Sequence, residues 1–256
     1  MTSRKHLSTR MWSSVALCLT CVIAAVAFTG CKAGNKSATK SQPGAYEGTE
    51  KVKPAAGTGN VQGKVMFNSK PVENIEVKLC ETFSRFVGGC GGKVYTARTD
   101  KDGEFVVANV PPKTYEALMA RVFDTDRSVF GTSGIAGISA TKYDVVADRT
   151  IFVDQIIHLF KSDLKTLNPK AAATVTVPGL ELKWEAYPDA AYYKVSVYAD
   201  DHNVTSPYVN ERVEGTSFSV AKPLQKGSYR WQVNAFNKDD RKLSGSSDDV
   251  KFTVSQ

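Results

Sequence analysis

Alternation of apolar and polar residues is the feature of this sequence that most constrains its fold. In "VQGKVMF" and "IEVKL" the residues at every second position are apolar or glycine, and "VYTART" and "EFVVANV" flank the turn "DKDG". A period of two places the apolar side chains of a run on one face of a β-strand, whereas a helix requires a spacing of three to four. Almost nothing after Val61 has helical spacing. The sequence therefore predicts an all-β protein.

A second set of strand signals follows a break at "TLNPKAAA", where Asn168-Pro169 and three alanines interrupt the pattern. Alternation resumes in five runs: Leu180 to Trp184, Tyr193 to Val197, Phe218 to Val220, Tyr229 to Ala235 and Val250 to Val254. Strands that each bury one face pack as two layers. A chain of 256 residues with 42% hydrophobic content can bury two small cores. We therefore expect two consecutive β-sandwiches, over residues 60–167 and 168–256.

The first thirty residues have the layout of a secretory signal, with a basic start, "MTSRKHLSTRMW", and an apolar segment, "SSVALCLTCVIAAVAFTG". The apolar segment is long for a signal peptide, so an uncleaved membrane anchor is the competing interpretation. The run "FTGC" resembles the lipobox of bacterial lipoproteins. The resemblance implies cleavage after residue 30 and attachment of lipid to Cys31. Several acyl chains on one residue hold a protein stably at a membrane.

These inferences predict a lipid-anchored protein of the cell envelope. Lys32 follows the cysteine where an inner-membrane retention signal of enteric bacteria would have Asp, which favours the outer membrane if the host is Gram-negative. Residues 31–59 are rich in Gly, Ala, Ser, Lys and Pro without apolar periodicity, so we expect a flexible tether there.

Cysteine usage agrees with an oxidising compartment. The chain has five cysteines: Cys18, Cys21, Cys31, Cys80 and Cys90. The first two leave with the signal and the third takes the lipid, so one pair remains and predicts a disulfide between Cys80 and Cys90. The alternative, a two-cysteine metal site, lacks further ligands, because the mature histidines, His158 and His202, are not at a metal-ligand spacing from the cysteines.

The first set of strands resembles a known accessory domain. The segments "GKVMFNSKPVENIEVKL" and "TDKDGEFVVANVPPKTYEALM" are similar to the carboxypeptidase regulatory-like domain, a transthyretin-like β-sandwich. The similarity covers Val61 to Phe123, with closing strands expected out to Phe160. Because that family is an accessory domain, the resemblance implies no peptidase activity.

Two motifs in this half invite alternative interpretations. Asp100, Asp102 and Glu104 supply oxygen ligands as part of an EF-hand loop would, but the glutamate at the twelfth position and the flanking helices are absent. Asp-Gly is a hairpin signal by itself, so we predict a turn. The segment "FGTSGIAGIS" carries Gly131, Gly134 and Gly137 but no following Lys-Ser/Thr, so a loop is favoured over a phosphate site, and its role stays open.

The second set of strands resembles a fibronectin type III domain over residues 172–256. The similar segments are "LELKWEAYPDAAYYKVSVY", "GTSFSV", "LQKGSYRWQVNAFN" and "VKFTV". The resemblance implies that Trp184 is the core tryptophan and that Tyr229 forms the tyrosine corner, whose hydroxyl bonds back to nearby backbone. The chain contains no "RGD", so the animal adhesion role does not transfer.

The motifs of common catalytic and nucleic-acid-binding classes are missing. The chain has no "HExxH", no "GxSxG" and no Cys-His pair, so we expect no enzyme activity, no cofactor and no metal. Three of the charges behind the net charge of +7, Arg4, Lys5 and Arg10, lie in the signal, and no basic block suggests a nucleic-acid partner. We expect a membrane-bound protein whose two modules bind or scaffold an envelope protein or a glycan. The alternative is a structural spacer or assembly subunit without a small ligand.

Strand parity predicts a candidate binding face. If Tyr193, Val195 and Val197 point inward, the intervening side chains of the two neighbouring strands share the opposite face. Those side chains are Tyr192, Lys194, Ser196, Tyr198, Arg230, Gln232 and Asn234. Rings mixed with hydrogen-bonding groups suit sugars or a protein partner. The alternative is an ordinary exposed sheet face with tyrosines that favour strands.

Overall fold

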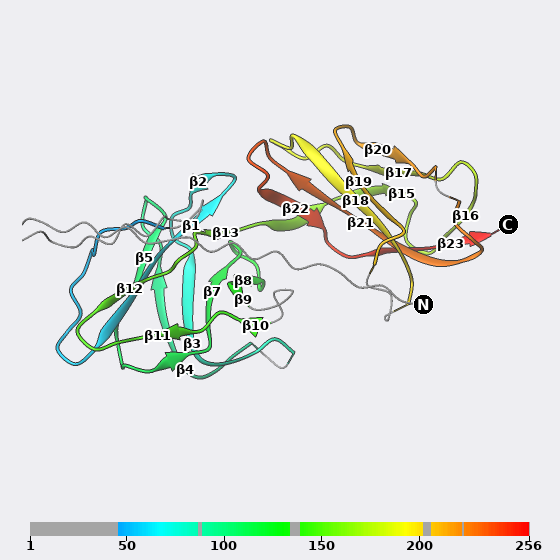
Figure 1. Ribbon diagram of the computed structural model, residues 1–256. Coiled ribbons are helices and arrows are strands. Elements are labelled where there is room, and N and C mark those ends of the chain that lie inside the picture. Colours follow the sequence, from blue (N-terminus) through cyan, green and yellow to red (C-terminus); the bar gives the residue numbers. More distant parts are fainter. Residues whose placement is uncertain (1–45, 87–88, 134–138, 202–205, 222, 256) are drawn as a thin grey trace, which may run out of the picture. The chain divides into compact units, whose positions relative to one another are not determined.

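A computed structural model describes residues 46–255, apart from residues 87–88, 134–138, 202–205 and 222. These residues form strands, turns and loops without any helix, which confirms the predicted all-β fold (Figure 1). Across the described part of the chain there is consequently no helix with the length and apolarity needed to cross a membrane.

The first half of the described chain contains thirteen strands. They are β1 (Gly59–Phe67), β2 (Lys70–Pro71), β3 (Glu76–Ser84), β4 (Gly89–Arg98), β5 (Glu104–Val110), β6 (Thr114–Tyr115), β7 (Ala117–Arg121), β8 (Ser128–Phe130), β9 (Thr132–Ser133), β10 (Ser139–Ala140), β11 (Tyr143–Asp144), β12 (Thr150–Phe152) and β13 (Ile157–His158).

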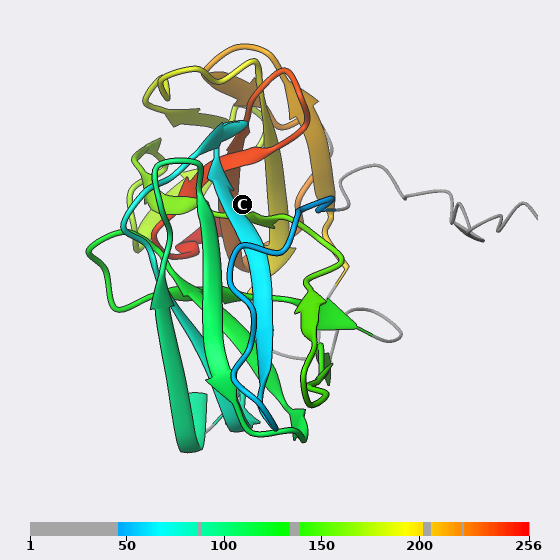
Figure 2. The same ribbon diagram turned by 90° about the vertical axis from the view of Figure 1, so that its left-hand side faces the viewer.

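Two main sheets form the first sandwich (Figure 2). In one, β1 pairs antiparallel with β2 and β5 and parallel with β12 and β13. The other has the order β4-β3-β7-β8. Val61 and Val65 of β1 pack with Val77 and Leu79 of β3 in one buried cluster between the sheets. The alternating residues of the sequence therefore form the core.

The second half contains ten strands. They are β14 (Lys161–Leu164), β15 (Thr166–Asn168), β16 (Ala173–Thr176), β17 (Glu181–Trp184), β18 (Tyr192–Ala199), β19 (Val209–Val213), β20 (Ser217–Ser219), β21 (Gly227–Phe236), β22 (Lys242–Ser246) and β23 (Val250–Ser255).

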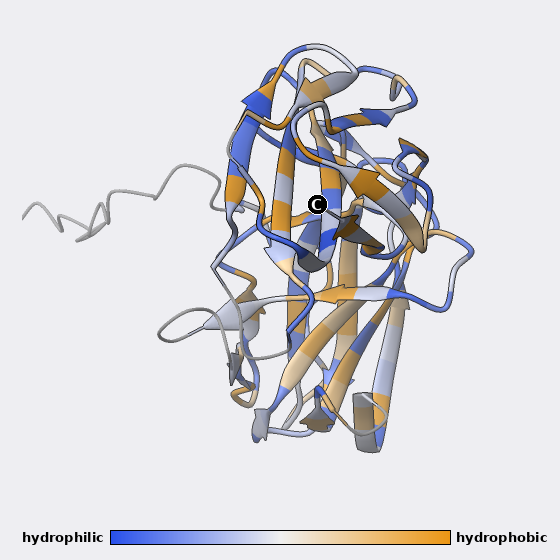
Figure 3. Ribbon diagram, turned by 90° about the vertical axis from the view of Figure 1, so that its right-hand side faces the viewer, coloured by the Kyte–Doolittle hydropathy of each residue, from blue (hydrophilic) through white to orange (hydrophobic). Residues whose placement is uncertain are grey.

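The second sandwich packs a seven-stranded sheet on a three-stranded one. The larger sheet has the order β14-β22-β21-β18-β19, with β23 on β21 and β16 on β23, and the smaller sheet is β15-β17-β20. Trp184 of β17 packs with Val195, Trp231 and Val233 of the larger sheet in the core. Along the strands, hydrophobic and hydrophilic residues alternate (Figure 3). The Tyr229 hydroxyl donates to the carbonyl oxygen of Gln225 at 3.0 Å, which is the tyrosine corner that the resemblance implied.

The change from one sandwich to the other falls earlier than the predicted boundary at residue 168. β13 pairs with β1 of the first sandwich, but β14 pairs parallel with β22 and β15 pairs antiparallel with β17. Leu164 is buried in the second core. The prediction that residues 161–167 belong to the first sandwich is therefore wrong, because these short strands complete both sheets of the second.

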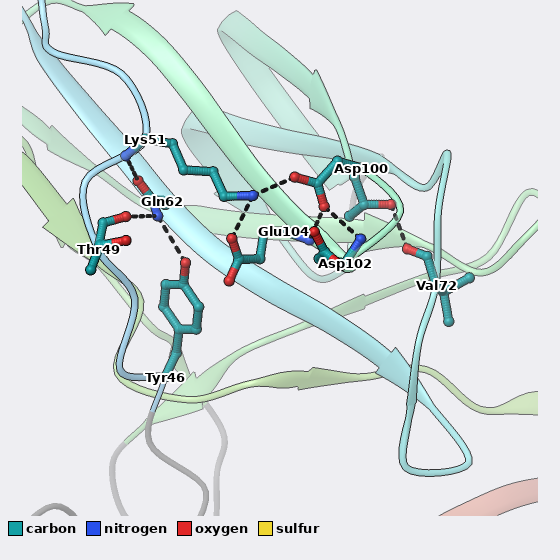
Figure 4. A network of polar contacts seen from close by, with 9 residues as sticks. Tyr46, Thr49, Lys51, Gln62, Val72, Asp100, Asp102 and Glu104 are labelled. Carbon is teal, nitrogen blue, oxygen red and sulfur yellow. Dashed lines mark hydrogen bonds and ion pairs between the residues drawn. The ribbon is translucent and has the colours of Figure 1, made fainter.

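Residues 46–58, which we call the N-terminal strap, lie against the first sandwich (Figure 4). The Gln62 side-chain amide donates to the Tyr46 hydroxyl and to the Thr49 carbonyl oxygen, each at 2.8 Å, and its oxygen accepts from the Lys51 backbone N–H at 3.1 Å. The Lys51 ammonium lies 2.6 Å from a Glu104 carboxylate oxygen. The predicted tether over residues 31–59 is therefore wrong for the strap, because side-chain bonds hold it without an apolar pattern.

The disulfide between Cys80 and Cys90 joins β3 to β4, which confirms the predicted pairing. The two strands are antiparallel neighbours, with Phe83 opposite Cys90. A crosslink across so short a loop restricts the unfolded chain, by up to about 2.7 kcal/mol in the chain-entropy model. The disulfide thus braces the β3–β4 hairpin.

Candidate functional site

The seven side chains predicted from parity lie on one face of the larger sheet of the second sandwich. β18 and β21 pair antiparallel, so Lys194 lies opposite Asn234, Ser196 opposite Gln232, and Tyr198 opposite Arg230. Residues directly opposite each other in a pair of strands share a face. The neighbouring strands extend this face with Asn210 and Arg212 of β19 and Lys251 of β23. We call this set of side chains the outer face.

Tyr192 belongs to the outer face but is not accessible. Its side chain is only 2% exposed, because the Phe236 ring stacks on it at 5.1 Å between centroids and the Arg212 guanidinium lies 3.6 Å from its ring centroid. Its hydroxyl donates to an Asp240 carboxylate oxygen at 3.0 Å. Burial, and then this carboxylate, raise the pKa of Tyr192. The expectation that Tyr192 contacts a ligand is therefore wrong, since its ring is covered.

Tyr198, Arg230 and Gln232 form the best-ordered part of the outer face. The Arg230 guanidinium lies 4.4 Å from the Tyr198 ring centroid and 2.6 Å from an Asp249 carboxylate oxygen. The Gln232 amide donates to the Tyr198 hydroxyl at 3.3 Å. These contacts hold the three side chains in fixed positions before any partner binds.

Basic groups run across the outer face, and their acidic partners lie at its margins. Lys194 is exposed, with its ammonium 5.0 Å from the Phe236 ring centroid. Arg212 lies 3.9 Å from an Asp240 oxygen, and Lys251 lies 3.1 Å from an Asp200 oxygen. Cations cover the rings of Tyr192, Tyr198 and Phe236, so the rings are poorly placed to stack on a sugar. Tyrosine and arginine are enriched at protein interfaces.

The "DKDG" segment forms the predicted turn, but not a hairpin, because it connects β4 of one sheet to β5 of the other. One Asp100 carboxylate oxygen accepts from the backbone N–H groups of Asp102 at 2.9 Å and Glu104 at 3.0 Å, and Gly103 has φ +72°. The carboxylates of Asp100 and Glu104 bind the Lys51 ammonium and raise its pKa above the ordinary value. In the ranges that the structure describes, no group of three or more His, Cys, Asp or Glu side chains is arranged to hold a metal ion.

Some predicted site residues lie outside the described residues. These are the lipidation site Cys31, the loop glycines Gly134 and Gly137, and His202. Gly131 is described, and it approaches the Tyr143 hydroxyl so closely that a Cβ atom there would lie 3.1 Å from it. The prediction missed Phe236 and Arg212. The parity of β21 places Phe236 on the outer face two residues after Asn234, whereas Arg212 could be found only by knowing that β19 lies beside β18.

The chain has only distant similarity to known proteins. No family model matches the chain, and no curated protein matches it. Among solved structures, the fibronectin(III)-like modules of CbhA from Clostridium thermocellum are 16% identical, with 79% of this chain and 92% of that chain covered and a TM-score of 0.29. The FN1–FN3 domains of chicken CNTN1 are 12% identical, with 80% and 67% covered and a TM-score of 0.30. BcpA, the major pilin subunit of Bacillus cereus, is 15% identical, with 77% and 69% covered and a TM-score of 0.24.

Proposed function

We propose that this chain is a lipid-anchored, non-catalytic protein of the bacterial cell envelope that binds a protein partner through the outer face of its second sandwich. The observation that carries the proposal is the group of mutually contacting side chains Tyr198, Arg230 and Gln232 on one face of the larger sheet. Side chains that are already ordered lose less conformational entropy on binding. The lipid anchor rests on the sequence "FTGC" at Cys31.

A protein partner suits the outer face better than a glycan does. The accessible groups are amides, a hydroxyl and cations, and Lys194 has no ion pair among the described side chains. The acids at the margins leave the centre of the outer face basic, so we expect a partner that carries carboxylates.

The test is crosslinking and capture from the native envelope with the intact lipoprotein. The double variant Lys194→Glu, Tyr198→Ala changes the charge and removes a ring, and both side chains are at least partly accessible. We expect an unchanged melting temperature and at least a tenfold loss of the captured partner, which corresponds to about 1.4 kcal/mol. A matched control, Lys165→Glu with Leu167→Ala, changes exposed residues outside the outer face and should leave capture intact. Equal capture by the two variants would contradict the proposal.

A spacer role is the second candidate, and contacts between the two halves favour it. In the β1–β2 turn, Asn68 donates to an Asp189 carboxylate oxygen at 2.8 Å, and Ser69 donates to an Asp239 carboxylate oxygen at 2.7 Å. Asn237 donates to the Asn68 side-chain oxygen at 2.9 Å. Such bonds restrict the motion of one sandwich relative to the other, as a spacer requires. If the variant Asn68→Ala, Ser69→Ala disturbs envelope assembly while the outer-face variant does not, the spacer role is the better description.

A further inference from the structure

The first sandwich contains a cavity that the proposed function does not use. Its volume is about 790 Å³, within the range of sites that bind small molecules. Three stretches line it: residues 129–133 from β8 and β9, residues 141–144 around β11, and residues from 151 to 160 around β12 and β13. It therefore lies in a different module from the outer face.

The cavity has aromatic walls. Phe130, Tyr143, Phe152 and Phe160 line it together with aliphatic side chains. Phe152 is 37% exposed although its ring is large, and the Tyr46 ring of the strap lies 6.1 Å from it between centroids. An exposed ring at the wall of a cavity offers a flat apolar surface to a ligand.

Hydrogen-bonding groups lie among the rings. Among the described side chains, none donates a hydrogen bond to the Tyr143 hydroxyl or accepts one from it. Burial, followed by the charge of Asp154, raises the pKa of Tyr143 to about 12. The hydroxyl therefore keeps its proton at neutral pH and can donate. Gly131 leaves room for it, because a Cβ at that position would lie 3.1 Å from the hydroxyl oxygen. Ser133 and Gln155, both exposed, add further donors and acceptors to the lining.

The charges of the lining exclude two other ligand classes. Asp144 and Asp154 outnumber Lys142, so a phosphate or carboxylate ligand would meet net repulsion. A pure hydrocarbon would bury the hydroxyl and amide groups without partners, which costs free energy for each group. The remaining match is an uncharged ligand with apolar faces and several hydroxyl groups.

We propose that this cavity binds an uncharged carbohydrate, with a sugar ring against Phe152 and its hydroxyl groups bonded to Tyr143, Gln155 and Asp154. The C–H face of a sugar ring packs on an aromatic ring, and the hydroxyl groups at the edge of the sugar form hydrogen bonds. These two properties match the aromatic rings and the hydrogen-bonding side chains of the cavity. The site is independent of the outer face, so loss of the protein partner and loss of the sugar are separate observations.

The test is calorimetric titration of the full chain, solubilised in a detergent whose head group is not a sugar. The probes are tetrasaccharides of glucose, mannose, galactose and N-acetylglucosamine, with dodecanoate as a hydrocarbon probe. We expect at least one tetrasaccharide to bind and dodecanoate not to compete with it. Absence of binding by all four sugars, or displacement of the bound sugar by dodecanoate, would overturn the proposal.

Variants locate the binding site. Tyr143→Phe keeps the ring and removes one hydroxyl. Because one hydrogen bond contributes about 1 kcal/mol, we expect a three- to tenfold weaker affinity. Phe152→Ala removes the ring that would pack on the sugar, so it should weaken binding at least tenfold. Gln155→Ala changes an exposed side chain, so we expect the melting temperature to stay unchanged and the affinity for the sugar to fall. Val146→Ala, an exposed position outside the lining, is the control. Unchanged affinity in all three cavity variants would place the sugar elsewhere and refute the assignment.

Discussion

Trp184 shows how a single residue holds the second sandwich together. It is 2% exposed and packs on Tyr193 at 5.4 Å between ring centroids, and its indole N–H has no hydrogen-bond partner within the described residues. Packing alone therefore accounts for the contribution of Trp184 to the free energy of unfolding. Trp184→Ala should lower the free energy of unfolding by about 3 to 5 kcal/mol, as for other buried aromatic residues. Urea denaturation measures this, with the exposed Lys165→Ala as control; a loss below about 1 kcal/mol would contradict the core assignment.

His158 links one residue to the pH dependence of stability. Burial, and then the charge of Arg241, lower its pKa in the folded protein. As the pH falls below about 6.5, His158 takes up a proton in the unfolded chain at a higher pH than in the folded protein. The contribution of neutral His158 to the free energy of unfolding is therefore fully present above about pH 6.5, and it is lost as the pH falls from there to the lower pKa of the folded state. His158→Gln should remove this part of the decline. Melting temperatures at pH 7.5 and 5.5 test it, and an equal decline in both proteins would show that other groups cause it.

Burial at single positions is where sequence reasoning was weakest. Parity placed Tyr192 on the correct face, because parity depends only on the strand itself. Its accessibility depends on Phe236, which lies opposite it on β21, and on Arg212 of a third strand, and the alternation within β18 contains no information on either contact. Gln62 is similar: it points away from the core, yet the strap covers it completely.

At the scale of elements, β14 and β15 decide where the second sandwich begins. A fragment of residues 161–256 contains both strands, whereas residues 168–256 lack β14 and most of β15. Without them, Leu164 no longer fills the second core, and β17 and β22 each lose a neighbour. We expect the longer fragment to unfold cooperatively and the shorter one to be less stable by at least about 2 kcal/mol. Chemical denaturation of both fragments measures the difference; equal stabilities would restore the boundary at residue 168.

Long strands were predictable from the sequence, and short ones were not. β1, β3, β18 and β21 bury a continuous row of apolar side chains, so their alternation is visible over several residues. Strands of two or three residues, such as β9, carry no measurable period. The strap was missed for a different reason: polar bonds and only a few buried side chains hold it, including Tyr46.

At the scale of the whole molecule, the proposed attachment to a membrane depends on one atom, the sulfur of Cys31. Cys31→Ser should prevent incorporation of labelled palmitate, because the thiol is the proposed site of the lipid. Cys21→Ser is the matched control, since it changes a cysteine ten positions earlier in the same segment and should retain the label. Radiolabelled palmitate, followed by membrane fractionation, gives the readout. Label in the Cys31→Ser variant would refute the anchor.

If Cys31 carries the proposed lipid, the strap also limits the distance between the modules and that anchor. A chain spans at most about 3.6 Å per residue, so residues 32–45 would allow a distance of at most about 50 Å from the proposed anchor, whereas residues 32–59 would allow about 100 Å. Halving the greatest distance between anchor and modules reduces the volume that the modules can explore about eightfold. The local concentration of the outer face near the membrane rises by the same factor. On the proposed lipid anchor, a partner must therefore expose its own contact surface close to the same membrane.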